Sequence, residues 1–414
     1  MSLNSTPQSV RVHIGIFGKR NAGKSSVINA ITNQEAAIVS DVLGTTTDPV
    51  FRPMEILPIG PCVLIDTAGL DDVGELGKLR INKSMDVLDK TDIALIVIDS
   101  SIGICEEDLT LTEKLKLKKI PYILVLNKVD KISDKSKIIE NVKNKINAPM
   151  ICVSSKDKIG IEELKKEIIN VMPQSSNDLK LVSDLIKPKD FVVLVVPIDK
   201  AAPKGRLILP QQQVIRDILD SGSTAIVVKE DELKDTLESL NKKPSIVITD
   251  SQVFESVNKD APKDILLTSF SILFARQKGD LDELIKGAYH LDKLKDGDKI
   301  LIAEGCTHHR QSDDIGKFKI PNLIRQRSGK DIIFEFTSGT TFTEDITQYA
   351  LVVHCGACMM NRNAMLSRIE KSKSLNVPIV NYGVLIAYTK GILDRTLEPF
   401  KLWWILKIWL INYT

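Results

Sequence analysis

Apolar, β-branched runs alternate along this chain with segments whose hydrophobic residues recur at helical spacing. Strands separated by helices in this way are typical of parallel sheets with crossover helices. The first third predicts strands at residues 10–17, 62–66, 93–99, 122–126 and 150–153. A second series is predicted at 191–197, 224–228, 245–249, 265–268, 299–303, 331–336, 350–353 and 378–381, with helix candidates such as 211–220 between the strands. The pattern therefore predicts an α/β fold.

Residues 173–178 are polar and rich in turn formers, which predicts a linker between the two series. A length of 414 residues also favours about three domains at roughly 150 residues each. We place the domains at 1–174, 175–262 and 263–400. The tail 401–414 holds all three tryptophans and is too short to span a bilayer. Its pattern suits a docking helix better than an interfacial anchor, and its role stays open.

Charge and cysteine content narrow the class of protein further. Lys plus Arg (56) nearly balances Asp plus Glu (54), so the net charge of +2 gives no overall attraction to nucleic acid or to anionic lipid. The polar N-terminus lacks the apolar segment of a secretory signal, which predicts a cytoplasmic protein. Six cysteines do not form a secreted disulfide framework in a chain of this length, and clustered ones favour metal binding or catalysis.

Residues 18–25 match the phosphate-binding pattern GxxxxGKS between a predicted strand and a predicted helix. Gly18 and Gly23 let backbone N–H groups close around phosphates at the positive end of the helix. Lys24 is placed to reach the β and γ phosphates and Ser25 to bind magnesium, and Ser26 completes the predicted set. The sequence thus predicts a nucleotide site.

Two further motifs follow predicted strands and indicate which nucleotide binds. Asp66 can hold the magnesium shell, and the amide of Gly69 can sense a γ-phosphate. Asn127, Lys128 and Asp130 form an NKxD motif. The Asp130 carboxylate can accept the N1–H and the exocyclic amine of guanine, whereas adenine would leave it unpaired. The site is therefore expected to select GTP.

A weaker element, Ser154-Ser155-Lys156, would bring backbone amides to guanine O6. Together the motifs predict a P-loop GTPase domain with a parallel-type sheet, followed by two further α/β domains.

The segment 44–48, Gly-Thr-Thr-Thr-Asp, resembles the switch loop of the TrmE-Era class of GTPases. By that resemblance Thr46 would close on magnesium in the GTP state, with Thr45 as the alternative. Leu70 stands where small signalling GTPases carry a water-positioning glutamine. Intrinsic GTP hydrolysis should therefore be slow or depend on another way of positioning the water. Asn21 stands where potassium-activated members of the class place an asparagine against the cation. The alternative is an ordinary turn asparagine.

Three cysteines near the end of the chain form a second candidate site. Cys355 and Cys358 form a CxxC step, which lets two sulfurs reach one metal. Cys306 and Cys355 each follow a predicted strand, so both would emerge at the carboxyl edge of a parallel sheet, where ligands usually bind. The three cysteines plus a histidine could close a zinc site. The same cysteines could instead hold an iron-sulfur cluster with an unusual fourth ligand.

The paired motifs Cys306-Thr307-His308 and His354-Cys355-Gly356-Ala357-Cys358, downstream of such a GTPase, resemble the HydF family of FeFe-hydrogenase maturation GTPases. The resemblance implies a scaffold that binds a 4Fe-4S cluster and holds a diiron subcluster as cargo for apo-FeFe-hydrogenase. It also implies two radical-SAM maturases as further partners. A middle dimerisation domain would make the protein a homodimer or a higher oligomer, and neither nucleic acid nor a membrane is an expected partner.

Carried over to this chain, the resemblance makes Cys306, Cys355 and Cys358 the cluster ligands. His308 and His354 become candidates for the fourth position, for which Glu304 also competes, and His309 lies outside the motif. GTP turnover would act as a switch between states of different partner affinity.

Two other classes of function compete with this interpretation. An RNA or ribosome-assembly GTPase with a C-terminal structural zinc site should carry a basic stripe, but Lys114, Lys116 and Lys118 look like a solvated helix face. A redox enzyme would need a second cofactor motif, which we do not find.

Overall fold

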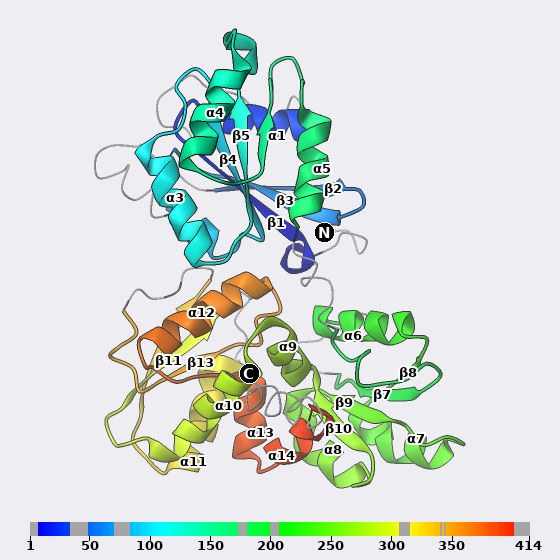
Figure 1. Cartoon of the computed structure of the whole chain (residues 1–414). Coiled ribbons are helices and arrows are strands. Elements are labelled where there is room, and N and C mark those ends of the chain that lie inside the picture. The colour runs from blue at the N-terminus through cyan, green and yellow to red at the C-terminus, as the bar shows by residue number, and fades with distance from the viewer. Residues whose placement is uncertain are drawn as a thin grey trace, which may run out of the picture. The chain divides into compact units, whose positions relative to one another are not determined.

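The computed structural model describes residues 7–33, 49–69, 83–172, 180–198, 207–305, 315–339, 342 and 345–400. The chain forms two compact units, Met1–Ser176 and Asn177–Thr414 (Figure 1). Thr46, Leu70, Cys306, His308, His309, the linker 173–178 and the tail 401–414 lie outside the described residues.

The first unit contains a six-stranded sheet in the order β2-β3-β1-β4-β5-β6. All neighbouring strands are parallel except β2 and β3. The strands are β1 (Val12–Phe17), β2 (Val50–Ile56), β3 (Gly60–Asp66), β4 (Ile93–Asp99), β5 (Tyr122–Asn127) and β6 (Met150–Cys152). The helices are α1 (Lys24–Thr32), α3 (Glu106–Leu117), α4 (Lys135–Lys145) and α5 (Ile161–Val171).

Helices cover both faces of this sheet. Apolar residues of α1 and α5 pack in one core with Ile14 and Leu95, and those of α3 and α4 pack in another with Phe17 and Ile96. The central strands are therefore apolar throughout, as strands buried on both faces require. The parallel register sets Ile16 opposite Asp66 and Asp99 opposite Asn127, which brings the predicted nucleotide motifs to one edge.

The second unit contains two four-stranded sheets with all strands parallel, in the orders β10-β9-β7-β8 and β12-β11-β13-β14. Both orders follow the same scheme, in which the third strand along the chain returns to pair with the first. The strands are β7 (Phe191–Val195), β8 (Thr224–Val228), β9 (Ile246–Thr249), β10 (Leu266–Ser269), β11 (Lys299–Glu304), β12 (Ile333–Ser338), β13 (Leu351–His354) and β14 (Ile379–Asn381).

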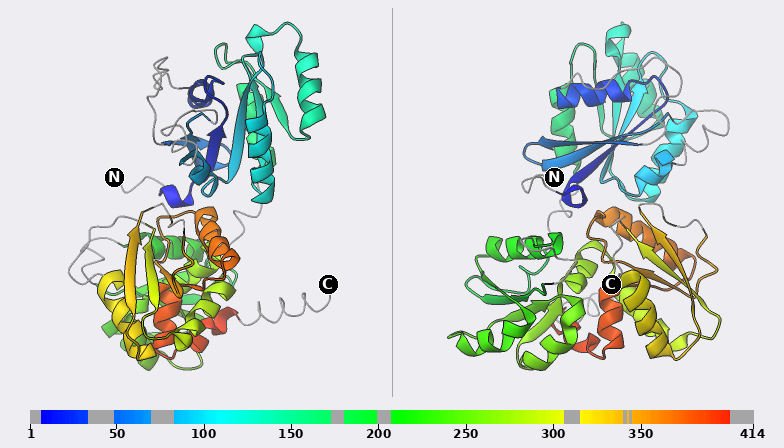
Figure 2. Two further views of the ribbon diagram at one scale, coloured as in Figure 1. Left: turned by 90° about the vertical axis from the view of Figure 1, so that its left-hand side faces the viewer. Right: turned by 180° about the vertical axis from the view of Figure 1, so that it is seen from behind.

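Helices join these two sheets into one body. The helices are α6 (Leu209–Asp220), α7 (Leu233–Ser239), α8 (Phe254–Asp260), α9 (Phe270–Lys278), α10 (Leu281–Tyr289), α11 (Ile320–Ser328), α12 (Arg362–Ser374), α13 (Tyr382–Thr389) and α14 (Leu393–Leu397). Figures 1 and 2 show α9, α13 and α14 between the two sheets. One continuous apolar core includes Leu194 of β7, Leu273 of α9 and Ile302 of β11.

The predicted α/β architecture is confirmed, and each predicted strand has a counterpart. β2 is missing from the prediction because it is an antiparallel edge strand whose residues are mostly exposed or half-buried and include Pro53. The boundary expected near residue 262 precedes β10, which pairs with β9. That boundary stays a prediction, and it would separate β10 from its sheet.

Candidate functional site

The phosphate-binding loop joins β1 to α1 in a backbone conformation that its glycines permit. Gly18 and Gly23 have φ of 143° and 94°. A Cβ on Gly18 would lie 2.3 Å from the carbonyl oxygen of Val97, and one on Gly23 would lie 2.2 Å from Nδ2 of Asn127. Both glycines are therefore required by the fold of the loop.

Lys24 and Ser25 are the first two residues of α1, and their side chains contact the phosphate-binding loop and Asp66, respectively. The Lys24 ammonium is buried and donates to the carbonyls of Gly18 (3.0 Å) and Lys19 (2.9 Å). Ser25 Oγ donates to Asp66 Oδ2 at 2.7 Å, and burial raises the pKa of Asp66. Hard oxygen ligands from Ser25 and Asp66 suit magnesium, whose charge would stabilise the ionised Asp66.

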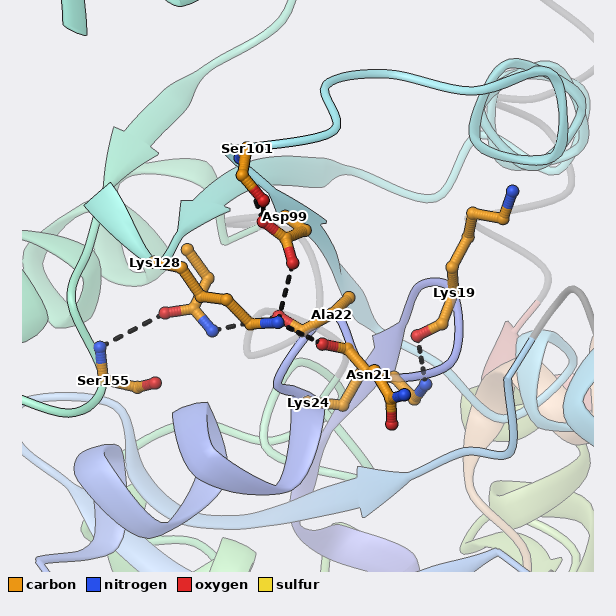
Figure 3. Close-up of polar contacts among 9 residues, drawn as sticks. Lys19, Asn21, Ala22, Lys24, Asp99, Ser101, Lys128 and Ser155 are labelled. Atoms are coloured by element: carbon orange, nitrogen blue, oxygen red, sulfur yellow. Dashed lines mark hydrogen bonds and ion pairs between the residues drawn. The ribbon is translucent and has the colours of Figure 1, made fainter. Parts of the chain in front are cut away.

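Asn127 ties the guanine-recognition motif to the phosphate loop through Ala22 and Ser155, which are labelled in Figure 3. Its Nδ2 donates to the carbonyl of Ala22 at 3.0 Å, and its Oδ1 accepts from the amide of Ser155 at 3.2 Å. The predicted P-loop, NKxD and Ser154-Ser155-Lys156 segments therefore meet at one place. Ser26 lies in the first turn of α1, and Gly69 lies beside the loop, since a Cβ on it would be 2.9 Å from the amide nitrogen of Arg20.

Lys128 spans the loop and the sheet edge. Its ammonium donates to the Asn21 carbonyl at 2.5 Å and pairs with Asp99 Oδ2 at 2.6 Å, while Asp99 accepts from Ser101 (Figure 3). Asp99 is missing from the predicted site, although a polar residue at the end of a buried strand is a signal that could have found it. This network fixes the Lys128 side chain between the phosphate loop and the end of β4.

Asp130, the carboxylate expected to recognise guanine, is exposed. Ser154 Oγ donates to its Oδ1 at 2.8 Å, and this hydrogen bond lowers the Asp130 pKa. Lys156, which lies two residues after Ser154, is exposed, and its charge also lowers the Asp130 pKa. The carboxylate thus stays ionised at neutral pH, as the recognition of guanine N–H groups requires.

The cysteine motif begins where β13 ends. The Cys355 amide donates to the Ala303 carbonyl of β11 at 2.9 Å, and the Gly305 amide donates to Cys355 Sγ at 3.1 Å. The end of β11, which leads directly into Cys306 in the chain, therefore lies against the Cys355 sulfur. β11 and β13 are the strands between which the chain order reverses, the place where parallel sheets open a crevice.

Cys355 and Cys358 are half-buried and are joined by a turn in which Ala357 has φ of 52°. Burial and the nearby Cys355 raise the Cys358 pKa, and Lys278 opposes this rise. Lys278 is itself 5% exposed, and burial lowers its pKa to about 8. The Lys278 charge therefore offsets part of the effect of burial on Cys358, whose thiolate is the metal-binding form.

His354 and Glu304, two candidates for the fourth ligand position, both contact other groups of the protein. His354 is fully buried, and its ring nitrogens contact the Cys355 carbonyl (2.8 Å) and Arg368 (2.7 Å). Glu304 Oε1 accepts from the Tyr382 hydroxyl at 3.3 Å. Within the described ranges no group of three or more His, Cys, Asp and Glu residues is placed to hold a metal, and Cys306 and His308 lie outside those ranges.

The described residues also lack any helix with the length and apolar character needed to cross a bilayer.

The sheet order, the phosphate loop and the guanine motif define the first unit as a P-loop GTPase domain. Residues 13–128 match the family described as 50S ribosome-binding GTPase. Residues 181–279 and 282–399 match the hydrogen maturase F dimerization domain and tetramerization domain, which together cover more than half of the chain. The chain therefore belongs to the hydrogen maturase F family of hydrogenase maturation GTPases.

Relatives of the first unit include GTPase Der of Persephonella marina, 34% identical over 40% of this chain and 39% of that protein. The tRNA modification GTPase MnmE of Thermoanaerobacter sp. is 41% identical over 38% of this chain and 34% of that protein. The chain thus spans well under half the length of these relatives. Among solved structures, Era of Aquifex aeolicus matches at 19% identity, covering 60% of this chain and 98% of that one, with a TM-score of 0.37.

Proposed function

We propose that this protein is a GTP-hydrolysing scaffold that holds a 4Fe-4S cluster and a diiron precursor and delivers the precursor to apo-FeFe-hydrogenase. The observation that carries the proposal is the contact between the Gly305 amide and Cys355 Sγ. It brings the strand that leads into Cys306 to the CxxC turn, at the crevice of a parallel sheet.

The chemistry of the donor set supports an iron-sulfur cluster. Soft thiolates from Cys355 and Cys358, with Cys306 adjoining Gly305 in the chain, would hold three irons, and the fourth position stays open to His308, His354, Glu304 or an exogenous ligand. When bound, the cluster would supply an iron site at which a cargo ligand can exchange. The protein's own part is to fix the thiols, to supply the Gly305 N–H to sulfur, and to keep the buried Lys278 charge beneath the turn.

The nucleotide site would supply the switch. Lys24, Ser25 and Asp66 bind the phosphates and magnesium, with Thr46 closing on magnesium in the GTP state, and Asp130 selects guanine. Asn21 would place a potassium ion against the phosphates. Hydrolysis would then change the affinity of the protein for its partners, which are the hydrogenase and two radical-SAM maturases.

The match of the second unit to a dimerization domain and a tetramerization domain supports a homodimer or a higher oligomer. A cytoplasmic location is part of the same proposal. Nucleic acid is not proposed as a partner, because Lys114 and Lys116 are exposed on α3 and Lys118, which directly follows the helix, pairs with Asp89 at 2.6 Å.

Anaerobic reconstitution with iron and sulfide, followed by electron paramagnetic resonance of the reduced protein, tests the carrier function. The wild-type chain should become brown and show a cluster signal, and Cys355→Ala should lose most of the bound iron. Cys152→Ala, which changes a half-buried thiol of the GTPase domain, is the matched control and should behave as wild type. A colourless protein with one zinc per chain would instead support the ribosome-assembly GTPase with a structural zinc site.

A further inference from the structure

We propose that His354 is a positioning residue of the cysteine turn and not a metal ligand, and that Arg368 and Lys278 hold this turn in its metal-binding shape. The role rests on the proposed function only in that the turn binds a soft metal. Here the cysteine turn means residues 355–360, which follow β13.

The hydrogen bonds of His354 fix its tautomer. Arg368 Nη1 lies 2.7 Å from His354 Nε2, and a guanidinium can only donate, so Nε2 must be the unprotonated, accepting nitrogen. The proton then lies on Nδ1, which donates to the Cys355 carbonyl at 2.8 Å. His354 is therefore neutral, and both of its nitrogens are occupied within the protein.

Coordination by either nitrogen would disrupt this arrangement. Binding through Nε2 would displace Arg368, which is only 4% exposed, and remove one acceptor from a buried guanidinium. Binding through Nδ1 would move the proton to Nε2, where it would face another donor. Arg368 is anchored from two other directions, since Nη2 donates to the Gly339 carbonyl at 3.1 Å and the guanidinium lies 5.0 Å from the Phe342 ring centroid.

Lys278, the last residue of α9, holds the same turn from another element. Its ammonium donates to the carbonyls of Ala357 (3.2 Å), Cys358 (3.1 Å) and Met360 (2.8 Å). With the bond from His354 to Cys355, four of the six carbonyls of the cysteine turn are held by side chains of α9 and β13. The turn thus has little backbone freedom to lose when a metal binds, which is how outer partners raise metal affinity.

Cobalt(II) titration of the reduced, anaerobic full-length protein tests this inference without requiring a cluster. The readout is the sulfur-to-cobalt charge-transfer band, which reports thiolate coordination directly. Arg368→Met should weaken cobalt binding by about 10- to 100-fold, because the turn loses its support through His354. If His354 were a ligand, the same substitution would free Nε2, and cobalt binding would stay unchanged or become tighter. That result would overturn the inference, as would a wild-type protein that binds no cobalt.

Two conservative variants separate positioning from a general loss of structure. Arg368→Lys keeps a donor and a charge and should recover part of the affinity. His354→Asn can still donate an amide N–H toward the Cys355 carbonyl and should bind more tightly than His354→Ala, whereas equal losses in these two would indicate a metal-binding imidazole. Arg327→Met, which removes the exposed pair between Arg327 of α11 and Asp292, is the matched control and should leave the affinity unchanged.

Cobalt binding and cluster assembly are separate measurements. A protein that shows this order of cobalt affinities but assembles no iron-sulfur cluster would refute the carrier function and leave the positioning role standing. If the protein binds a cluster but its Arg368→Met variant binds cobalt as tightly as wild type, the positioning role is refuted and the carrier function stands.

Discussion

Asn21 illustrates how one residue of the phosphate loop combines a structural and a proposed chemical role. Its backbone has φ of 59°, a conformation that asparagine tolerates better than most residues, and its carbonyl accepts from Lys128. The side chain is exposed at the loop, so it is free of the core and can take part in binding. The turn conformation alone would account for an asparagine here, and only a functional measurement separates the two roles.

We expect GTP hydrolysis to rise when potassium replaces sodium at fixed magnesium. An asparagine oxygen can help to place a monovalent cation against the phosphates, where it would offset negative charge that develops during transfer. Phosphate release measured in the two salts gives the ratio of rates. Equal rates in both salts would contradict a potassium site.

Asn21→Ala supplies the control for this measurement. It should remove the potassium stimulation while leaving GTP affinity close to that of wild type, because Asn127 and Asp130 recognise the base. A variant that keeps the stimulation would place the cation elsewhere.

Residues outside any motif are the ones that sequence reasoning missed. Lys278 and Arg368 lie on helices among other lysines and arginines, and nothing in their spacing distinguishes them from solvated cations. Burial distinguishes them, and burial depends on which helix face meets the sheet. Cys355 and Cys358, in contrast, were identified because thiols two residues apart have few structural uses in a long chain with few cysteines.

At the scale of elements, Arg395 of α14 links this helix to the C-terminal end of α8. Its guanidinium donates to the carbonyls of Asn258 (2.9 Å), Ala261 (2.9 Å) and Pro262 (2.7 Å). These carbonyls lie at the C-terminal end of α8, where a cation also complements the helix dipole. The Arg395 side chain thus adds a polar connection between α14 and the end of α8 to the packing of the apolar core.

We expect Arg395→Met to lower the free energy of unfolding of the second unit by about 2 kcal/mol, the usual contribution of hydrogen bonds to a charged group. Urea unfolding followed by circular dichroism measures the change. Arg216→Met is the control, because Arg216 forms an exposed pair with Asp220 within α6 and its loss should cost less than about 0.5 kcal/mol. Equal losses in the two variants would contradict a connecting role for Arg395.

At the scale of the whole molecule, the chain divides into two units of which only the first contains the nucleotide motifs. The two sheets of the second unit share one apolar core, so that unit is expected to unfold as a single body. A ligand that binds only the folded first unit stabilises that unit by mass action.

Calorimetry of the full chain should therefore show two unfolding transitions. A magnesium-bound GTP analogue at about 100 times its dissociation constant should stabilise the first unit by about 2.7 kcal/mol and leave the other transition in place. Guanosine without phosphates, at the same concentration, controls for non-specific effects. A single transition that moves as a whole with the analogue would show that the units unfold together.

The α/β class, the strands other than β2, the nucleotide motifs and the cysteine pair could all be predicted from the sequence. These features are local, since a strand is written in consecutive apolar residues and a phosphate loop in eight positions. Tertiary structure alone decided that β11 and β13 adjoin, which sets the Gly305 amide on the Cys355 sulfur. It also decided that His354 faces Arg368, because contacts between residues far apart in the chain depend on strand order and helix packing, which no local pattern encodes.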